Sequence, residues 1–310
     1  MQQRPKTSVK TAPEETVLPA SPQRPTPLWR CKGRALSLAT PLVMGILNVT
    51  PDSFSDGGRH LSTACALEHA LAMIDAGADI IDVGGESTRP GAQPLTEAEE
   101  LGRILPVIQH LAQKSAIPIS VDTRHAAVAR QALAAGAHIV NNVACFTGDV
   151  AMACAVREAA AGLVIMHSRG TPQTMMSLAT YDDVVSTVEA ELLQALAFAQ
   201  EQGISREACV LDPGLGFAKN TEQNVRLLAS VNRLRALGPL LIGASHKRFI
   251  GELCHQPDPA QRLSGSLCAS VWSVLQGASI LRVHDVRETK ECLAVALALQ
   301  AVHTNEKQAC

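Results

Sequence analysis

Short apolar runs alternate with longer Ala- and Leu-rich stretches from residue 41 onward. The longer stretches have the apolar spacing of amphipathic helices, whereas the short runs are rich in Val, Ile and Leu, as buried strands are. Thr96 and Glu99 have the spacing of a capping box, which predicts that a helix begins there. The pattern predicts eight strands: Leu42–Leu47, Ile80–Val83, Ile117–Val121, His138–Val140, Leu163–Met166, Cys209–Leu211, Leu240–Ile242 and Ile280–Val283.

Three of these strands begin in nearly the same phrase, "AGADII", "AGAHIV" and "QGASIL". A glycine that ends a helix shortly before a strand is typical of a helix-to-strand junction. Repeats of this kind over about 240 residues match the size of a (β/α)8 barrel, or TIM barrel. An open doubly wound sheet is the alternative, but no glycine-rich phosphate loop follows the first strand. We therefore predict an α/β fold, a TIM barrel over residues 36–304.

Residues 1–35 have a different composition, with prolines among Thr, Ser, Gln, Lys and Glu and little to bury. This composition predicts a disordered tail. A transit peptide is the alternative, but Glu14, Glu15 and the many prolines fit an amphipathic, acid-poor presequence badly.

Charge and cysteine content narrow the class of protein further. The formal net charge of −2 argues against binding to nucleic acid or a membrane surface through bulk charge. The chain has 9 cysteines, with no C-x-x-C pair and no secretory signal, which is typical of reduced thiols in a cytoplasmic protein. No apolar run approaches the roughly 20 residues that a membrane span needs.

Every predicted strand ends near a polar side chain. The active site of a TIM barrel lies at the carboxyl ends of its strands, so these side chains are expected to share one mouth. Each alone is also explained as a helix cap or turn residue, but the whole set favours a site. The set is Asn48, Asp82 with Glu86, Asp122, Asn141, His167, Asp212, Ser245 with Lys247, and Arg282 with His284.

The residue types indicate two halves of a binding site. Arg89, Lys247, Arg282 and His284 suit a diphosphate, because arginine pairs phosphate oxygens in bidentate fashion. Asn48 offers one neutral oxygen ligand, which suits Mg²⁺ held mainly by substrate oxygens.

An acceptor-rich group, Asp122, Asn141 and Asp212, together with Lys247, suits the polar edge of a flat heterocycle. A metal site is the competing use of two carboxylates, but no zinc-type histidine spacing supports it. We interpret His167 as structural rather than as a ligand.

The stretches "MGILNVTPDSFSDGG" and "IDVGGESTRPGA" resemble the two signature motifs of the dihydropteroate synthases, a family of folate-biosynthesis enzymes. The segments "SVDT", "LVIMH", "LDPGLGF", "RLSGSL" and "LRVHDV" follow in the order and spacing of that family. The resemblance covers roughly residues 41–300. It implies a homodimeric transferase that joins 6-hydroxymethyl-7,8-dihydropterin diphosphate to 4-aminobenzoate with Mg²⁺, gives 7,8-dihydropteroate and diphosphate, and is a target of sulfonamides.

The resemblance also implies roles for individual residues. The pterin would be bound by Asp122, Asn141, Met166, Asp212, Phe217 and Lys247. The diphosphate would be bound by Asn48, Arg89, Arg282 and His284, with Asn48 also on Mg²⁺. The aminobenzoate would be bound by Phe54, Thr88, Pro90 and Arg248, under loops that close over it. The catalytic residues would be Asp122, Lys247, Arg282 and His284.

Four positions depart from the family pattern. His246 stands where the family usually has Arg, Asn142 where it has Asp, Ala218 where it has Gly, and Ser168 where it has Met. An active enzyme is expected, and the alternative is a degenerate or sulfonamide-insensitive paralogue that binds pterin with weak turnover. Three further classes would also use such a mouth: a pterin-dependent methyltransferase, a Schiff-base aldolase with Lys247 as nucleophile, and a non-catalytic pterin-binding protein.

Overall fold

The computed structural model describes residues 27–49, 58–86, 94–144 and 146–309. The predicted TIM barrel is confirmed, with eight parallel strands in the order β8-β7-β6-β5-β4-β3-β10-β9. A parallel bridge between Leu211 and Leu240 joins the two ends of this order and closes the ring. The strands are β3 (Leu42–Asn48), β4 (Ile80–Gly84), β5 (Ile119–Asp122), β6 (Ile139–Asn142), β7 (Gly162–Met166), β8 (Cys209–Asp212), β9 (Leu241–Ile242) and β10 (Ile280–Val283).

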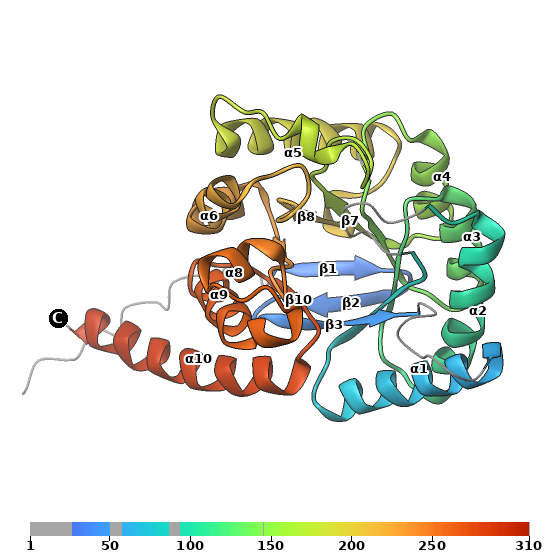
Figure 1. Ribbon diagram of the computed structural model, residues 1–310, viewed down its shortest axis with the longest axis horizontal. Helices are drawn as coiled ribbons and strands as arrows, with labels where there is room; N and C mark the ends of the chain where they lie inside the picture. The colour runs from blue at the N-terminus through green and yellow to red at the C-terminus, as the bar shows by residue number, and fades with distance from the viewer. Residues whose placement is uncertain (1–26, 50–57, 87–93, 145, 310) are drawn as a thin grey trace, which may run out of the picture.

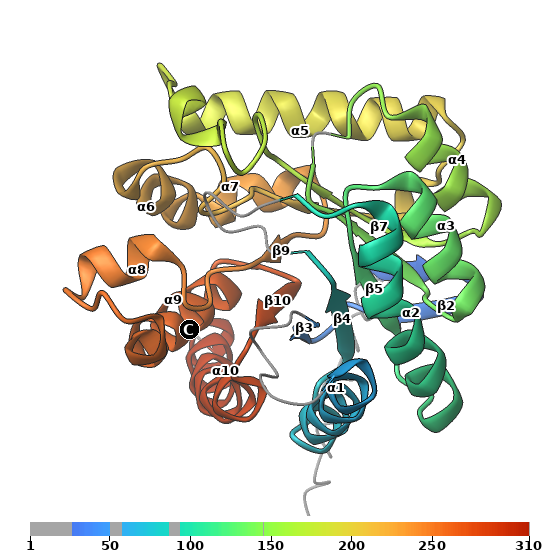
Figure 2. The same ribbon diagram turned by 45° about the vertical axis from the view of Figure 1, so that its right-hand side comes forward.

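Helices surround these strands (Figure 2). They are α1 (Gly58–Asp75), α2 (Glu97–Lys114), α3 (Ala126–Ala135), α4 (Val150–Glu158), α5 (Val184–Glu201), α6 (Thr221–Ala229), α7 (Val231–Leu234), α8 (Arg248–Leu253), α9 (Leu263–Leu275) and α10 (Val286–Ala309). The capping box predicted for α2 is present, since Glu99 N donates to Thr96 Oγ1 (3.3 Å) and Thr96 N donates to Glu99 Oε2 (3.0 Å). Among the described residues, no helix has both the length and the apolar character to cross a bilayer.

The alternation of side chains along each strand positions the site. One set of side chains faces outward into the main core beneath the helices, as Val43, Ile81 and Leu281 do. The other set points into the barrel, where Met44, Ile80 and Ile280 belong to a separate core near its amino end. Because successive side chains alternate, the residues two positions further along share this interior face nearer the carboxyl ends. They are Ile46, Asp82 and Arg282, with Asn141, Met166 and Asp212 at the equivalent level.

A short antiparallel hairpin covers the amino end of the barrel. It consists of β1 (Leu28–Cys31) and β2 (Arg34–Ser37), joined at Lys32 and Gly33, whose φ angles of 43° and 77° suit a type I′ turn. Trp29 is fully buried against the inner core, and its Nε1 donates to the Ala208 carbonyl (2.8 Å). Residues 28–35, which the composition assigns to the tail, are therefore part of the folded domain, and residues 1–26 lie outside the described chain. Figure 1 shows this hairpin beside the strands and α10 extending away from the barrel.

Candidate active site

A cavity of about 760 Å³ opens at the carboxyl ends of the strands. This volume lies within the range of small-molecule sites. The predicted site residues on its lining are Asn48, Asp122, Phe217, Lys247, Arg248, Arg282 and His284. The structure thus brings together residues that are more than 200 positions apart in the sequence, because neighbouring parallel strands end at one mouth.

Arg282 is the centre of a buried charge network on the interior face. Its Nε donates to Asp82 Oδ2 (2.6 Å) and its Nη2 donates to Asp122 Oδ2 (2.5 Å). Asn141 Nδ2 donates to the same Asp82 oxygen (3.0 Å). Asp82, which the sequence places at a strand end without a binding role, therefore orients both Arg282 and Asn141. The alternation of side chains along the strand could have revealed this position, because Asp82 lies two residues after Ile80, which points into the barrel.

The network shifts the ionisation of its members. Burial raises the pKa of Asp122 to about 7, although the Arg282 guanidinium opposes this shift. Burial by itself lowers the pKa of Arg282, but the nearby carboxylates of Asp82 and Asp122 together have the larger effect and raise this pKa. The pKa of Asp122 therefore lies above that of an ordinary carboxyl group, while Arg282 stays a cation that faces the cavity.

Lys247 lies at the start of α8 with its Nζ 4.3 Å from the centre of the Phe217 ring. Burial lowers the pKa of Lys247 to about 8, and the Arg282 charge adds to this effect. Asp212 is held by its own turn, since its Oδ1 accepts a hydrogen bond from Gly214 N (2.7 Å). Burial raises the pKa of Asp212, and this backbone donor and Lys247 oppose the rise. A heterocycle edge between Asp212 and Lys247 would meet one acceptor and one cation.

The turn after β8 depends on one glycine. Gly214 has φ +67°, and a Cβ there would lie 1.9 Å from the His167 carbonyl oxygen. Only glycine allows both this left-handed conformation and the close approach of the two backbones. The position of Asp212 therefore depends on the "DPG" sequence of the predicted motif.

The other predicted site residues occupy three kinds of position. Asn141, Met166 and Asp212 lie deep in the barrel, at most 5% exposed, and Met166 packs with Phe217. Arg248 lies at the rim, where its side chain is 71% exposed and its Nε pairs with Glu252 Oε1 (2.6 Å). Four predicted residues lie outside the described chain: Phe54, Thr88, Arg89 and Pro90.

Asn48 fits the role of a magnesium ligand in its chemistry and place. It ends β3, is half-buried and lines the cavity beside Arg282 and His284. Its amide carbonyl is the hard neutral oxygen that Mg²⁺ accepts beside substrate phosphates. Ser245 orients His284, since Ser245 Oγ lies 3.0 Å from His284 Nδ1 and accepts from its backbone N (3.2 Å).

The four departures from the family pattern have different surroundings. His246, at φ 55°, has Nε2 2.6 Å from Asp285 Oδ2 and Nδ1 2.5 Å from the Pro259 carbonyl. Asn142 is fully buried, and its Oδ1 accepts from Ala144 N (2.8 Å), as an aspartate would. Ala218 has φ 48°, a conformation that glycine adopts without strain. Ser168 is buried and does not line the cavity.

A buried lysine network supports the wall that carries Phe217. Lys219 Nζ donates to the carbonyls of Gly214 (3.0 Å) and Phe217 (2.9 Å) and lies 2.9 Å from His167 Nδ1. His167 Nε2 lies 2.8 Å from Glu191 Oε2. Burial lowers the pKa of Lys219 to about 7 and also lowers that of His167. A neutral His167 would accept from Lys219 and donate to Glu191, and these contacts agree with a structural role for His167. The role of Lys219 is not visible in the sequence.

The fold and the site together define a class: a TIM-barrel enzyme whose strand ends gather carboxylates and cations around a cavity for a small polar substrate. The family model described as pterin binding enzyme matches residues 44–284. Dihydropteroate synthase from Escherichia coli (strain K12) is 45% identical over 277 residues, which cover 89% of this chain and 98% of that relative.

Two solved structures have the same fold. Xanthomonas albilineans dihydropteroate synthase with 4-aminobenzoic acid has a TM-score of 0.84 and 45% identity, covering 89% of this chain and 99% of that chain. The same enzyme in complex with 7,8-dihydropteroate has a TM-score of 0.81 and 43% identity, with the same coverage. The chain belongs to the pterin binding enzymes and, among them, to the dihydropteroate synthase family.

Proposed function

We propose that this protein is a transferase that condenses 6-hydroxymethyl-7,8-dihydropterin diphosphate with 4-aminobenzoate to give 7,8-dihydropteroate and diphosphate. The observation that carries this proposal is the arrangement of Asp122, Lys247, Arg282 and His284 around one cavity in a chain of this family. The product and 4-aminobenzoate that are named for the two Xanthomonas structures agree with it.

The pterin would bind at the inner end of the cavity. Asp122 and Asp212 offer carboxylate acceptors for ring N–H groups, Asn141 offers an amide, and Lys247 offers a cation for the ring carbonyl. Met166 packs against Phe217, and the Phe217 ring lies on the cavity lining, where it would contact a face of the heterocycle. Because burial raises the pKa of Asp122 to about 7, its charged carboxylate form is favoured by higher pH.

The diphosphate would bind at the outer side, near Arg282 and His284, with Arg89 as a third group outside the described residues. Asn48 would hold Mg²⁺, which neutralises charge on the diphosphate when it is bound. During the reaction the bond between the pterin methylene carbon and the diphosphate oxygen breaks, and diphosphate leaves with the electron pair. The Arg282 cation stabilises the charge that builds on the leaving group, and the Asp122 carboxylate favours the positive charge left on the pterin.

The amine of 4-aminobenzoate then forms a C–N bond with the methylene carbon and releases one proton to solvent. Arg248, which is exposed at the rim and paired with Glu252, would pair instead with the aminobenzoate carboxylate. Phe54, Thr88 and Pro90 complete this subsite in our proposal. Sulfonamides, which resemble aminobenzoate, would compete for it.

We also propose a homodimer and a cytoplasmic location. A stripe on α10 is unusually apolar for an exposed face: Val295, Leu299 and Val302 are 62%, 68% and 58% exposed. Spacings of four and three residues place these side chains on one helix face, which a second copy would cover. All 7 cysteines in the described residues are free, which agrees with a reducing compartment.

Two variants test the proposed site. Arg282→Ala should abolish turnover with the fold intact by circular dichroism, because the leaving group loses its main buried cation. Asp212→Asn should weaken pterin binding at least about tenfold in calorimetry, the equivalent of about 1.4 kcal/mol. Normal turnover in the first variant, or unchanged affinity in the second, would show that the assigned subsite is wrong.

A further inference from the structure

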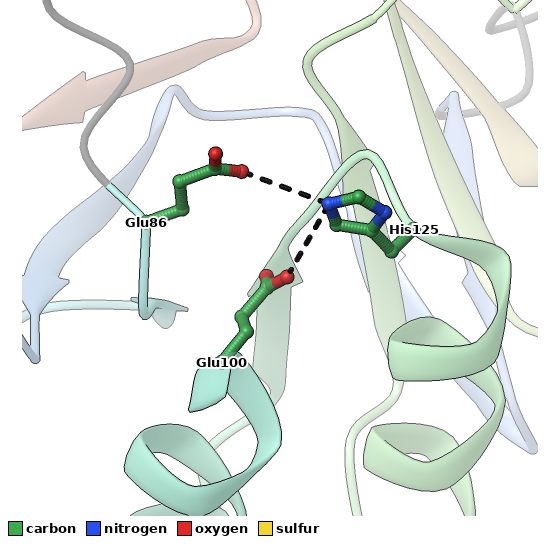
Figure 3. A group of neighbouring side chains, drawn as sticks. All are labelled: Glu86, Glu100 and His125. Carbon is green, nitrogen blue, oxygen red and sulfur yellow. Dashed lines mark ion pairs between the residues drawn. The ribbon is translucent and has the colours of Figure 1, made fainter. Parts of the chain in front are cut away.

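Two carboxylates and an imidazole converge beside the cavity, outside the proposed pterin and diphosphate subsites (Figure 3). Glu86 follows β4, Glu100 lies in the first turns of α2, and His125 immediately precedes α3. The His125 Nε2 atom lies 3.9 Å from Glu86 Oε2 and 4.0 Å from Glu100 Oε2. One nitrogen and two oxygens, each on a different element, therefore face one small volume, with all three atoms within 4.8 Å of one another.

Glu100 is the unusual member of this group. Its side chain is fully buried, and neither carboxylate oxygen makes a hydrogen bond within the described part of the chain. His125 Nε2, which faces it, also lacks a hydrogen bond there. Burying polar groups without partners is unfavourable. A buried carboxylate with free acceptor oxygens that points at an imidazole nitrogen without a hydrogen bond therefore indicates a cation between them.

The surroundings leave the facing atoms available for a ligand. The other oxygen of Glu86, Oε1, accepts from Arg124 Nη2 (2.8 Å) and from Leu95 N (3.3 Å), so the carboxylate is fixed with Oε2 toward the cluster. On the far side of the imidazole, His125 Nδ1 lies 3.8 Å from Glu97 Oε1. Metal-binding histidines commonly have a carboxylate on the side of the second ring nitrogen; Glu97 lies on that side, at a distance too long for a hydrogen bond, and acts on His125 through its charge.

We propose that Glu86, Glu100 and His125 form a binding site for a divalent transition metal, Zn²⁺ in the first instance, distinct from the Mg²⁺ expected at Asn48. An imidazole nitrogen with two carboxylate oxygens is a donor set that zinc accepts and that magnesium does not prefer. Ligand atoms at about 2.0–2.2 Å from a tetrahedral ion lie roughly 3.4 Å apart. The two nitrogen-to-oxygen separations, 3.9 and 4.0 Å, would therefore close by about half an ångström on binding, and the two carboxylate oxygens, which lie within 4.8 Å of each other, would close by at most about 1.4 Å.

Such an ion would tie together the ends of three elements. Glu86 also lines the cavity, so the bound ion would fix the position of β4 relative to α2 and α3 at the edge of the active site. None of its three ligands belongs to the proposed pterin or diphosphate subsites, so metal binding can be tested separately from the proposed reaction.

The test uses full-length protein stripped with a chelator and titrated with Co²⁺, whose visible spectrum reports its coordination. Wild-type protein should bind one ion in the absence of substrates, with visible bands typical of nitrogen and oxygen ligands, and Zn²⁺ should displace it. Glu100→Gln and His125→Ala should each weaken binding at least about a hundredfold. Glu97→Gln, which acts only through His125, should weaken it about tenfold.

His110→Ala is the matched control, because His110 is an exposed histidine on α2 whose Nδ1 lies 2.6 Å from the Pro106 carbonyl. This variant should bind Co²⁺ like wild type. Thermal unfolding with and without Zn²⁺ shows whether each variant is folded. If Glu100→Gln does not fold, the comparison of wild type with His125→Ala decides the question. Equal binding in wild type and His125→Ala, no saturable binding, or a thiolate-to-cobalt band from exposed cysteines such as Cys254 would each overturn the proposal.

Discussion

Asparagine in place of Asp82 would test how Arg282 is held at the barrel mouth. Asp82 is fully buried, and its Oδ2 accepts from both Arg282 Nε (2.6 Å) and Asn141 Nδ2 (3.0 Å). The substitution keeps the side-chain size but removes the negative charge. Asp122 then remains as the acidic partner of Arg282 within the described residues.

The expected loss of stability follows from these contacts. A hydrogen bond to a charged group contributes about 1.5–3 kcal/mol, and breaking a buried ion pair costs about 3–5 kcal/mol. Arg282 keeps Asp122, and its side chain is 18% exposed, so water solvates part of the guanidinium. The cost therefore falls toward the low end, and we expect Asp82→Asn to lower the free energy of unfolding by about 2–3 kcal/mol.

Urea denaturation of wild type and variant measures this difference. Glu222→Gln is the matched control, because Glu222 pairs with Arg226 (2.7 Å) on the surface, where the two side chains are 72% and 59% exposed. Its cost should stay below about 0.5 kcal/mol. Asp82→Asn should also lower kcat/KM for dihydropteroate formation at least about tenfold, because the misplaced Arg282 no longer stabilises the leaving group. A stability loss no larger than that of Glu222→Gln would refute this account of the network.

Three further predictions concern Ala218, Asp122 and Lys219. Ala218→Gly should raise the free energy of unfolding by about 0.5–1 kcal/mol, since it removes a left-handed alanine; a loss in thermal or urea unfolding would contradict the strain argument. Pterin affinity, measured by calorimetry, should fall as the pH drops below about 7 and Asp122 becomes protonated, and Asp122→Asn should not show this dependence. The folded Lys219 has a pKa of about 7 against an ordinary 10.5, so the unfolded chain binds more protons between these values. Wild-type stability relative to Lys219→Met should therefore rise with pH over this window, and equal pH slopes in denaturation experiments would contradict the burial of this lysine.

The barrel and the outline of its mouth follow from the sequence for a simple reason. Strands covered on both faces are continuous apolar runs, and their order along the chain determines which polar groups share the mouth. Asn48, Asp122, Lys247, Arg282 and His284 therefore meet as expected. Strand order alone does not determine which of these groups pair with each other.

Features that depend on packing between distant segments are not visible in the pattern. The hairpin of β1 and β2 is two short strands next to a proline-rich segment, so its composition resembles a tail, and its stability comes from Trp29 in the end of the barrel. Lys219 follows an apparently ordinary loop, yet it donates to two carbonyls of that loop from a buried position. Glu100 lies in the first turn of α2, where acidic residues are usually exposed to solvent, but here it is on the buried face of the helix.

Aminobenzoate-dependent release of diphosphate is the sharpest test of the proposed reaction. Purified protein would be incubated with Mg²⁺, 6-hydroxymethyl-7,8-dihydropterin diphosphate and 4-aminobenzoate, with both diphosphate and 7,8-dihydropteroate measured over time. We expect equal amounts of the two products, formed only when aminobenzoate is present, and neither product with Arg282→Ala. Binding of the pterin substrate without formation of dihydropteroate would contradict this expectation and identify the chain as a pterin-binding paralogue without turnover.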